Sequence, residues 1–197
     1  NTAGMIPYHQ LNSLQNPMAT HGDRKSFKGI FFYPPLDPKF ARTIMTDFTA
    51  KVQEDPDLAA SGLLLEFFDM RKVCEVPQTA TAFASRNHTQ NGIVVLRWTD
   101  ATKDGDHRAW AREVQKQWKA ELDTKTTNGE NDVPQYINYA ERRFSVLSIT
   151  CMLTCVAGDS AIKNIYGENL SRLQELKARY DPRNVFNKMQ AIPLGLS

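Results

Sequence analysis

The stretch YGENLSRLQELKARYDPRNVF, residues 166–186, holds the clearest structural pattern in this chain. Its apolar residues recur at helical spacing and fall near one face, namely Tyr166, Leu170, Leu173 and Tyr180. Pro182 cannot continue a helix and biases the residue before it away from helical geometry. The pattern therefore predicts a short amphipathic helix that stops before Pro182. Val185 and Phe186 follow, and we expect them to form an apolar anchor that docks the tail.

Alternating strand and helix patterns precede this stretch. Residues 1–24 are polar and turn-rich, which favours an extended segment, and the polar stretch 123–135 predicts a loop. Strand patterns cover residues 27–33, 62–68, 80–85, 92–98 and 136–139. Helices are expected after Asp37-Pro38, a good helix start, and after Asp106. Together these elements predict an α+β fold, with a largely antiparallel sheet covered by helices on one face.

The composition limits the possible partners. A chain of 197 residues can build one domain with a substantial core, and a net charge of +2 without a basic stripe argues against nucleic acid. The longest apolar-leaning run, residues 144–157, is too short to span a bilayer, so no membrane partner is expected.

Cysteines and glycosylation sequons add little. The three cysteines are odd in number, so they form no disulfide framework, and Cys151 and Cys155 have no neighbouring histidine to complete a zinc site. No metal site is expected. Sequons at Asn87 and Asn169 are compatible with secretion, but such triplets also arise by chance, so the compartment stays open.

The C-terminal stretch resembles the signature of berberine bridge enzyme-like, FAD-linked oxidoreductases. The matching parts are the Tyr166 to Leu173 segment, DPRNVF at 181–186 and QAIP at 190–193. Upstream, YINY at 136–139 resembles the Tyr-x-Asn-Tyr motif of the same family. AFASR at 82–86, followed by a strand that ends in Trp98, resembles the order of these motifs in fungal members of the family.

This resemblance implies a substrate-binding domain over residues 1–160. Residues 161–197 would form a helix and tail that return to an FAD-binding domain, in the same or a separate chain. The implied cofactor is FAD, and the implied reaction oxidises a small organic substrate with oxygen as the electron acceptor. Nothing in this sequence resembles the family's pyrophosphate loop or its flavin-bonding histidine, so this chain is expected to supply the substrate side of the site.

The YINY motif supplies the first candidate site residues. A phenol near a flavin can act as an acid or base, which makes Tyr136 and Tyr139 candidate catalytic residues. An amide such as that of Asn138 can form a hydrogen bond with the edge of a flavin ring. Asn138 and Tyr166, the latter from the tail motif, are therefore the candidate cofactor-binding residues. The alternative is a tyrosine-rich edge strand with a structural amide.

Glu66 and Arg97 are the remaining candidates. Glu66 interrupts an apolar strand, where a carboxylate is either a general base or one half of an ion pair. Arg97 is its expected partner, or a substrate-binding residue. Plant members carry Lys-x-Gln or a glutamate on the strand that resembles residues 92–98, whereas this chain reads Val-Leu-Arg at 95–97. That departure argues against the plant-type base.

Two other interpretations stay open. A domain of this kind without flavin could bind a small molecule, or catalyse its cyclisation or dehydration. It could also be an inactive partner subunit. The distinguishing feature is whether an FAD-binding domain accompanies the chain.

Overall fold

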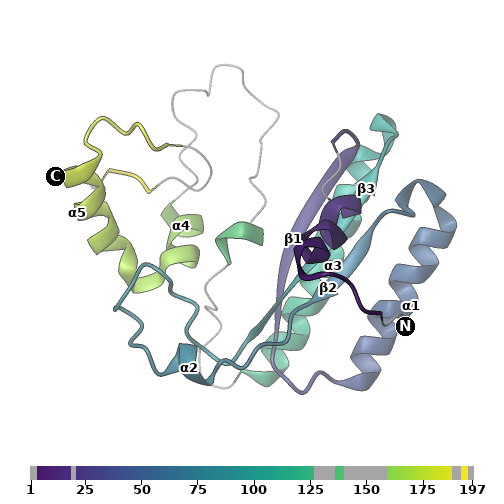
Figure 1. Cartoon of the computed structure of the whole chain (residues 1–197), viewed down its shortest axis with the longest axis horizontal. Helices are drawn as coiled ribbons and strands as arrows, with labels where there is room; N and C mark the ends of the chain where they lie inside the picture. Colours follow the sequence, from purple (N-terminus) through teal and green to yellow (C-terminus); the bar gives the residue numbers. More distant parts are fainter. Residues whose placement is uncertain (1–3, 19–20, 127–135, 140–158, 188–191, 195–197) are drawn as a thin grey trace.

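The computed structural model describes residues 4–18, 21–126, 136–139, 159–187 and 192–194 (Figure 1). The elements are, in chain order, η1 (Tyr8–Met18), β1 (Arg24–Phe32), α1 (Pro38–Glu54), η2 (Pro56–Leu58), β2 (Gly62–Leu65), α2 (Arg71–Cys74), β3 (Gln90–Trp98), η3 (Ala101–Lys103), α3 (Asp104–Lys125), η4 (Ile137–Tyr139), α4 (Asp159–Tyr166), η6 (Gly167–Asn169) and α5 (Leu170–Tyr180).

Three strands form one antiparallel sheet in the order β1-β3-β2. In the register, Gly29 pairs with Ile93 and Leu64 pairs with the same residue from the other side. Residues directly opposite each other share a face of the sheet. The mixture of helices with an antiparallel sheet confirms the α+β prediction.

One face of the sheet forms the core with α1 and α3. The buried cluster takes Ile30 and Phe32 from β1, Val94, Leu96 and Trp98 from β3, Ile44 from α1, and Ala111, Val114 and Trp118 from α3. Strand side chains alternate between faces, so every second residue of β1 and β3 reaches these helices. The opposite face carries Phe27, Gly29, Phe31, Leu64, Glu66, Ile93, Val95 and Arg97. We call it the η4 face because η4 packs on it.

Local signals decide where the two covering helices begin. Asp37 caps α1 by accepting a hydrogen bond from the Lys39 N–H, and Pro38 occupies the first turn, as predicted. Helix α3 begins at Asp104 instead of after Asp106. The Asp104 carboxylate accepts from the Trp98 indole and pairs with Arg24, so it joins the helix start to the ends of two strands.

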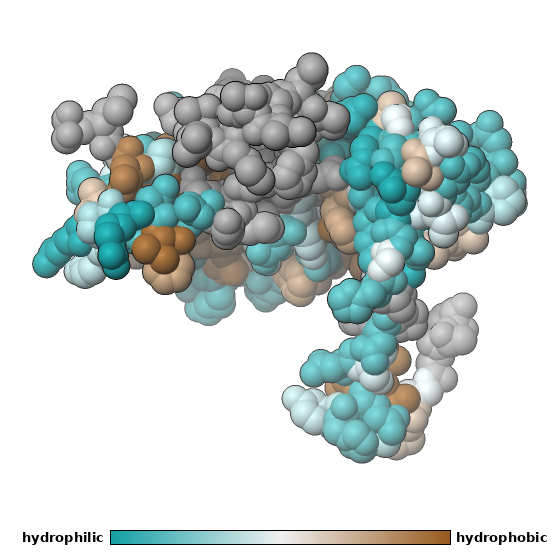
Figure 2. Space-filling view, turned by 90° about the horizontal axis from the view of Figure 1, so that it is seen from above, coloured by the Kyte–Doolittle hydropathy of each residue, from teal (hydrophilic) through white to brown (hydrophobic). Residues whose placement is uncertain are grey.

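Three expected segments differ in the structure. The N-terminal segment contains η1, a 3-10 helix, where an extended segment was expected; Figure 2 shows it projecting from the body of the molecule. Residues 80–82 form a bend and residues 83–85 are irregular, where a strand was expected. The YINY motif is also not a strand, because Ile137–Tyr139 forms a 3-10 turn closed by the Tyr139 N–H bonding to the Tyr136 carbonyl. The apolar run 144–157, with Cys151 and Cys155, lies outside the described residues; Cys74 is a free thiol.

The C-terminal helix is interrupted where a continuous one was expected. Gly167 adopts φ 54°, a left-handed conformation that glycine accepts at little cost. It begins η6, which separates α4 from α5. Helix α5 ends at Tyr180 as predicted. Val185 and Phe186 do not dock within the described residues, since they are 62% and 80% exposed. In the described part of the chain, no helix is both long and apolar enough to cross a membrane.

Candidate functional site

A phenol–carboxylate pair forms the centre of the candidate site. The Tyr139 hydroxyl donates to Glu66 Oε1 at 2.7 Å, which joins η4 to the residue after β2. Glu66 continues the β2–β3 ladder, because its N–H donates to the Asn91 carbonyl at 2.9 Å. The sheet therefore fixes the carboxylate, and the carboxylate fixes the phenol.

The environment keeps Tyr139 protonated. Burial disfavours the phenolate, and the hydrogen bond to the Glu66 carboxylate stabilises the neutral phenol; together they raise the pKa of Tyr139 to about 12. Near neutral pH this residue is therefore a hydroxyl that donates to Glu66. Its oxygen keeps lone pairs that can accept a proton from another hydroxyl.

Tyr136 and Asn138 lie beside this pair. The rings of Tyr136 and Tyr139 meet edge to face with centroids 4.9 Å apart. The Asn138 amide nitrogen donates to the Tyr136 hydroxyl oxygen at 2.8 Å. Asn138 is exposed, and its amide carbonyl oxygen can accept a further hydrogen bond. The turn thus presents two phenols and an amide within four residues.

Arg97 does not pair with Glu66, contrary to the expectation. Its guanidinium forms an ion pair with Asp23, just before β1. The register explains the separation, because Asn91 is the neighbour of Glu66 and Arg97 lies at the other end of β3. At the usual rise per residue, roughly 20 Å of strand lies between them. Arg97 shares the η4 face with Glu66 but is distant from it.

Tyr166 is the last residue of α4. It is half-buried, and burial raises the pKa of its phenol. The structure thus brings Tyr136, Asn138, Tyr139 and Glu66 together, places Arg97 at the other end of β3, and has Tyr166 on a different element, α4.

Two residues outside the six candidates hold the surrounding structure. Asn169 of the tail motif is 6% exposed, and its amide donates to the Gln78 carbonyl at 3.0 Å. Gly29 lies directly under Tyr139, since a Cβ on this glycine would fall 3.0 Å from the Tyr139 Cβ. A glycine inside an aromatic strand is a signal that could have indicated such a close approach.

Comparison with known proteins finds a family match for the C-terminal part of the chain, which contains the YINY turn. Residues 135–193 match the family model described as berberine and berberine like. The chain carries a berberine-like region. That match spans the YINY turn, α4, α5 and the tail, so it includes four of the six candidate residues: Tyr136, Asn138, Tyr139 and Tyr166.

Relatives extend the likeness to most of the chain. It is 28% identical over 175 residues to an aclacinomycin-N/aclacinomycin-A oxidase of Streptomyces galilaeus, covering 88% of this chain and 30% of that protein. It is 30% identical over 144 residues to an FAD-linked oxidoreductase of Neurospora crassa, covering 71% of this chain and 24% of that protein. The chain thus spans less than a third of the length of either relative. The resemblance to FAD-linked oxidoreductases of the berberine bridge type is confirmed.

Solved structures agree on the fold. The berberine bridge enzyme of Eschscholzia californica superposes with a TM-score of 0.65 at 18% identity, covering 94% of this chain and 36% of that enzyme. The crystal structure of aclacinomycin oxidoreductase gives a TM-score of 0.55 at 24% identity, covering 87% of this chain and 33% of that one. The berberine-like region and the sheet before it therefore share the fold of part of these oxidases.

The described groups suit one part of FAD. A flavin ring presents carbonyl oxygens and ring nitrogens along its edge, and the exposed Asn138 amide and the Tyr136 phenol offer matching donors and acceptors. A diphosphate instead needs clustered backbone N–H groups, usually from a glycine-rich loop. The ten glycines of this sequence are scattered. The residues present fit the ring edge and not the diphosphate.

Proposed function

We propose that this chain forms the substrate side of an FAD-linked oxidase that acts on a hydroxyl of a small organic molecule. The observation that supports the proposal most directly is the hydrogen bond that joins Tyr139, in the berberine-like region, to Glu66 on the η4 face. The relatives are named FAD-linked oxidoreductases and oxidases, which supports FAD as the cofactor and oxygen as the electron acceptor.

Tyr139 and Glu66 would move the substrate proton. The Tyr139 oxygen accepts the proton of the substrate hydroxyl as its own proton passes along the existing hydrogen bond to the Glu66 carboxylate. This relay leaves Tyr139 neutral before and after the step, in agreement with a phenol pKa of about 12. When bound, FAD supplies hydride acceptance from the substrate carbon. Tyr136 and Asn138 would hold the substrate or the ring edge.

We also assign the two parts of the chain different roles. Residues 1–160 would carry the substrate surface, and residues 161–197 would return to the FAD-binding domain. The exposed apolar side chains at the end of α5 support the second role (Figure 2). In this arrangement Tyr166 would order the tail near the cofactor and Arg97 would meet a remote part of the substrate. Neither nucleic acid nor membrane is a partner in this proposal.

Substitution of the pair tests the relay. Tyr139→Phe and Glu66→Gln in the full encoded protein should each lower kcat by roughly 100 to 10,000 times, the usual range for general acid–base groups. Tyr136→Phe is the matched comparison. Its phenol would hold the substrate or the ring edge and has no bond to Glu66 within the described residues, so this variant should change KM more than kcat. Equal losses of kcat in all three variants, or none, would refute the relay.

An absorption spectrum tests the cofactor. The full protein should show flavin bands near ~450 nm that bleach on addition of substrate without oxygen. A colourless, folded full-length protein would overturn the oxidase proposal and favour a flavin-free binding or cyclising domain.

A further inference from the structure

We infer that Gly29 is a positioning residue that seats Tyr139 against the sheet, so that the phenol reaches Glu66. The inference rests on the proposed function for its catalytic consequence, and on the packing of η4 for its structural part. Gly29 is buried in the middle of β1.

The contact leaves no room for a side chain. A Cβ added to Gly29 would lie 3.0 Å from the Tyr139 Cβ, 3.2 Å from its carbonyl oxygen and 3.6 Å from its carbonyl carbon. The three nearest atoms therefore all belong to one residue, and two of them are backbone. A flexible side-chain end could rotate away, but backbone atoms can give way only if the whole turn moves.

The strand side of the contact is also held. The Gln115 side-chain amide, from α3, donates to the Gly29 carbonyl oxygen at 2.7 Å. Gly29 also pairs with Ile93 of β3 in the sheet register. Because helix and sheet both fix this glycine, an added methyl group would displace η4 and leave β1 in place.

A displaced turn would weaken the hydrogen bond between the phenol and the carboxylate. Contacts of 3.0 and 3.2 Å are relieved when the turn gives by a few tenths of an ångström. Because the Tyr139 hydroxyl lies 2.7 Å from Glu66 Oε1, a shift of that size would lengthen or bend the bond and slow the relay. The loss in rate is smaller than the roughly 100-fold that a full ångström of misplacement can cost. Gly29 would thus act through Tyr139 and would not touch the substrate itself.

The test compares Gly29→Ala with Gly62→Ala in the full encoded protein. Gly62 lies on the same η4 face, but a Cβ there would meet only Leu64 Cδ1, at an ordinary 3.9 Å. Both variants add the same methyl group to one sheet. We expect kcat to fall several-fold in Gly29→Ala and to stay near wild type in Gly62→Ala. In a Tyr139→Phe background, Gly29→Ala should cost little more, because its target is already gone.

A second readout does not depend on turnover. With tyrosines labelled by ¹³C at the ring carbon that bears oxygen, the Tyr139 signal is the one that Tyr139→Phe removes. Its pKa should be about 12 in the wild type, where burial and the bond to Glu66 both raise it. It should be lower in Gly29→Ala, because the weaker bond to Glu66 removes part of that rise. If the protein proves not to be an oxidase, this titration still tests whether Gly29 positions Tyr139 against the sheet.

Gln115→Ala provides a second test in case the Gly29→Ala variant does not fold. It adds no atoms, frees the Gly29 carbonyl, and should lower the Tyr139 pKa in the same direction by a smaller amount. An unchanged Tyr139 titration in folded Gly29→Ala would overturn the inference. So would an equal change in Gly62→Ala.

Discussion

At the scale of single residues, buried polar groups hold the candidate site and the tail in place. The Asn169 amide reaches from η6 to the Gln78 carbonyl, in the loop between α2 and β3. A buried asparagine needs a hydrogen-bond partner, because a buried donor without an acceptor lowers the stability of the folded state. The bond therefore fixes the start of α5 against the loop.

Replacing Asn169 with Ala should lower the free energy of unfolding by roughly 1–3 kcal/mol, the usual cost of removing a buried hydrogen-bonded group. Urea unfolding followed by circular dichroism would measure it. The control is Asn164→Ala, which alters an exposed asparagine of the neighbouring α4. A cost for Asn169→Ala no larger than that of the control would mean that this bond contributes nothing.

The candidate residues themselves were partly predictable. Glu66 and the YINY tyrosines were identified, because a carboxylate in an apolar strand and a family motif are local signals. Their pairing was not, because the Glu66–Tyr139 bond joins residues 73 positions apart. Arg97 was predicted to pair with Glu66 only because both residues interrupt an apolar strand pattern. The strand register, which the sequence does not contain, separates them.

At the scale of elements, Asp57 connects η2 to the residues between β3 and η3. Its carboxylate accepts hydrogen bonds from the Thr99 N–H at 3.0 Å, the Thr99 hydroxyl at 2.7 Å and the Asp100 N–H at 3.0 Å. Asp57 lies in η2, and its partners lie between β3 and η3. These hydrogen bonds, the one from the Asp100 N–H foremost, lower the pKa of Asp57 to about 2. The carboxylate thus ties the end of α1 to the start of α3.

This connection predicts a dependence of stability on acid. A lowered folded pKa means that the stabilisation is fully present above the ordinary value of 3.8, and is lost as the pH falls toward about 2. Asp57→Asn should therefore be less stable than wild type at pH 7, and the gap should shrink between pH 4 and 2. Thermal unfolding across this range measures it. Asp47→Asn, in the exposed part of α1, should show no such gap.

The elements differed in how well the sequence specified them. Helix α1 was predicted closely, because Asp37, Pro38 and the apolar spacing are all local. The YINY turn was wrongly predicted as a strand, since its tyrosines favour strands and its 3-10 shape depends on packing over Gly29. The break at Gly167 was missed because a helical apolar face continues through it.

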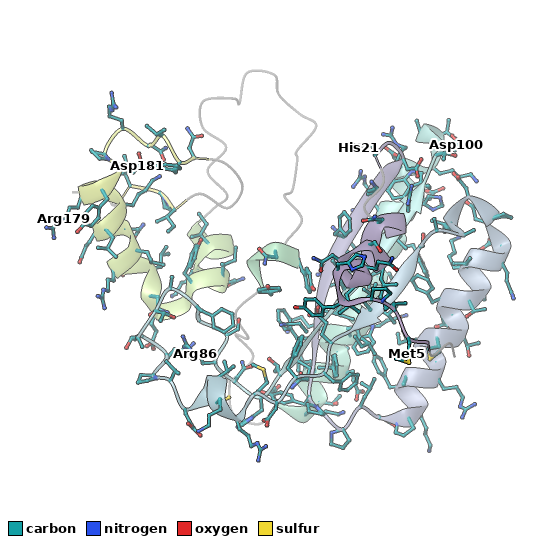
Figure 3. The ribbon with its side chains drawn as sticks, viewed as in Figure 1. Met5, His21, Arg86, Asp100, Arg179 and Asp181 are labelled. Carbon is teal, nitrogen blue, oxygen red and sulfur yellow. The ribbon has the colours of Figure 1, made fainter. Side chains whose placement is uncertain are left out.

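At the scale of the whole molecule, the tail presents apolar groups on a hydrogen-bonded turn. Asp181, at the end of α5 (Figure 3), accepts from the Val185 and Phe186 N–H groups at 2.8 and 3.0 Å. Its carboxylate also forms an ion pair with Lys177. Lys177 also donates to the Phe186 carbonyl at 2.7 Å. These bonds hold the backbone of the turn in place, while the side chains of Val185 and Phe186 are exposed to solvent. In the proposed arrangement, these apolar side chains pack against the FAD-binding domain.

The size of one mutational effect decides whether that interface exists. If Phe186 packs against an FAD-binding domain, Phe186→Ala in the full encoded protein should lower the free energy of unfolding by about 3–5 kcal/mol, as for a buried aromatic residue. If it stays in solvent, the change should be within about 0.5 kcal/mol. Met45→Ala is the control, because Met45 is 65% exposed on α1, far from the tail in the fold. A small effect at both positions would reject the tail's return to the cofactor domain. A large effect at Phe186 alone, with earlier release of flavin on heating, would establish it, because the described part of this chain offers that side chain no burial of its own.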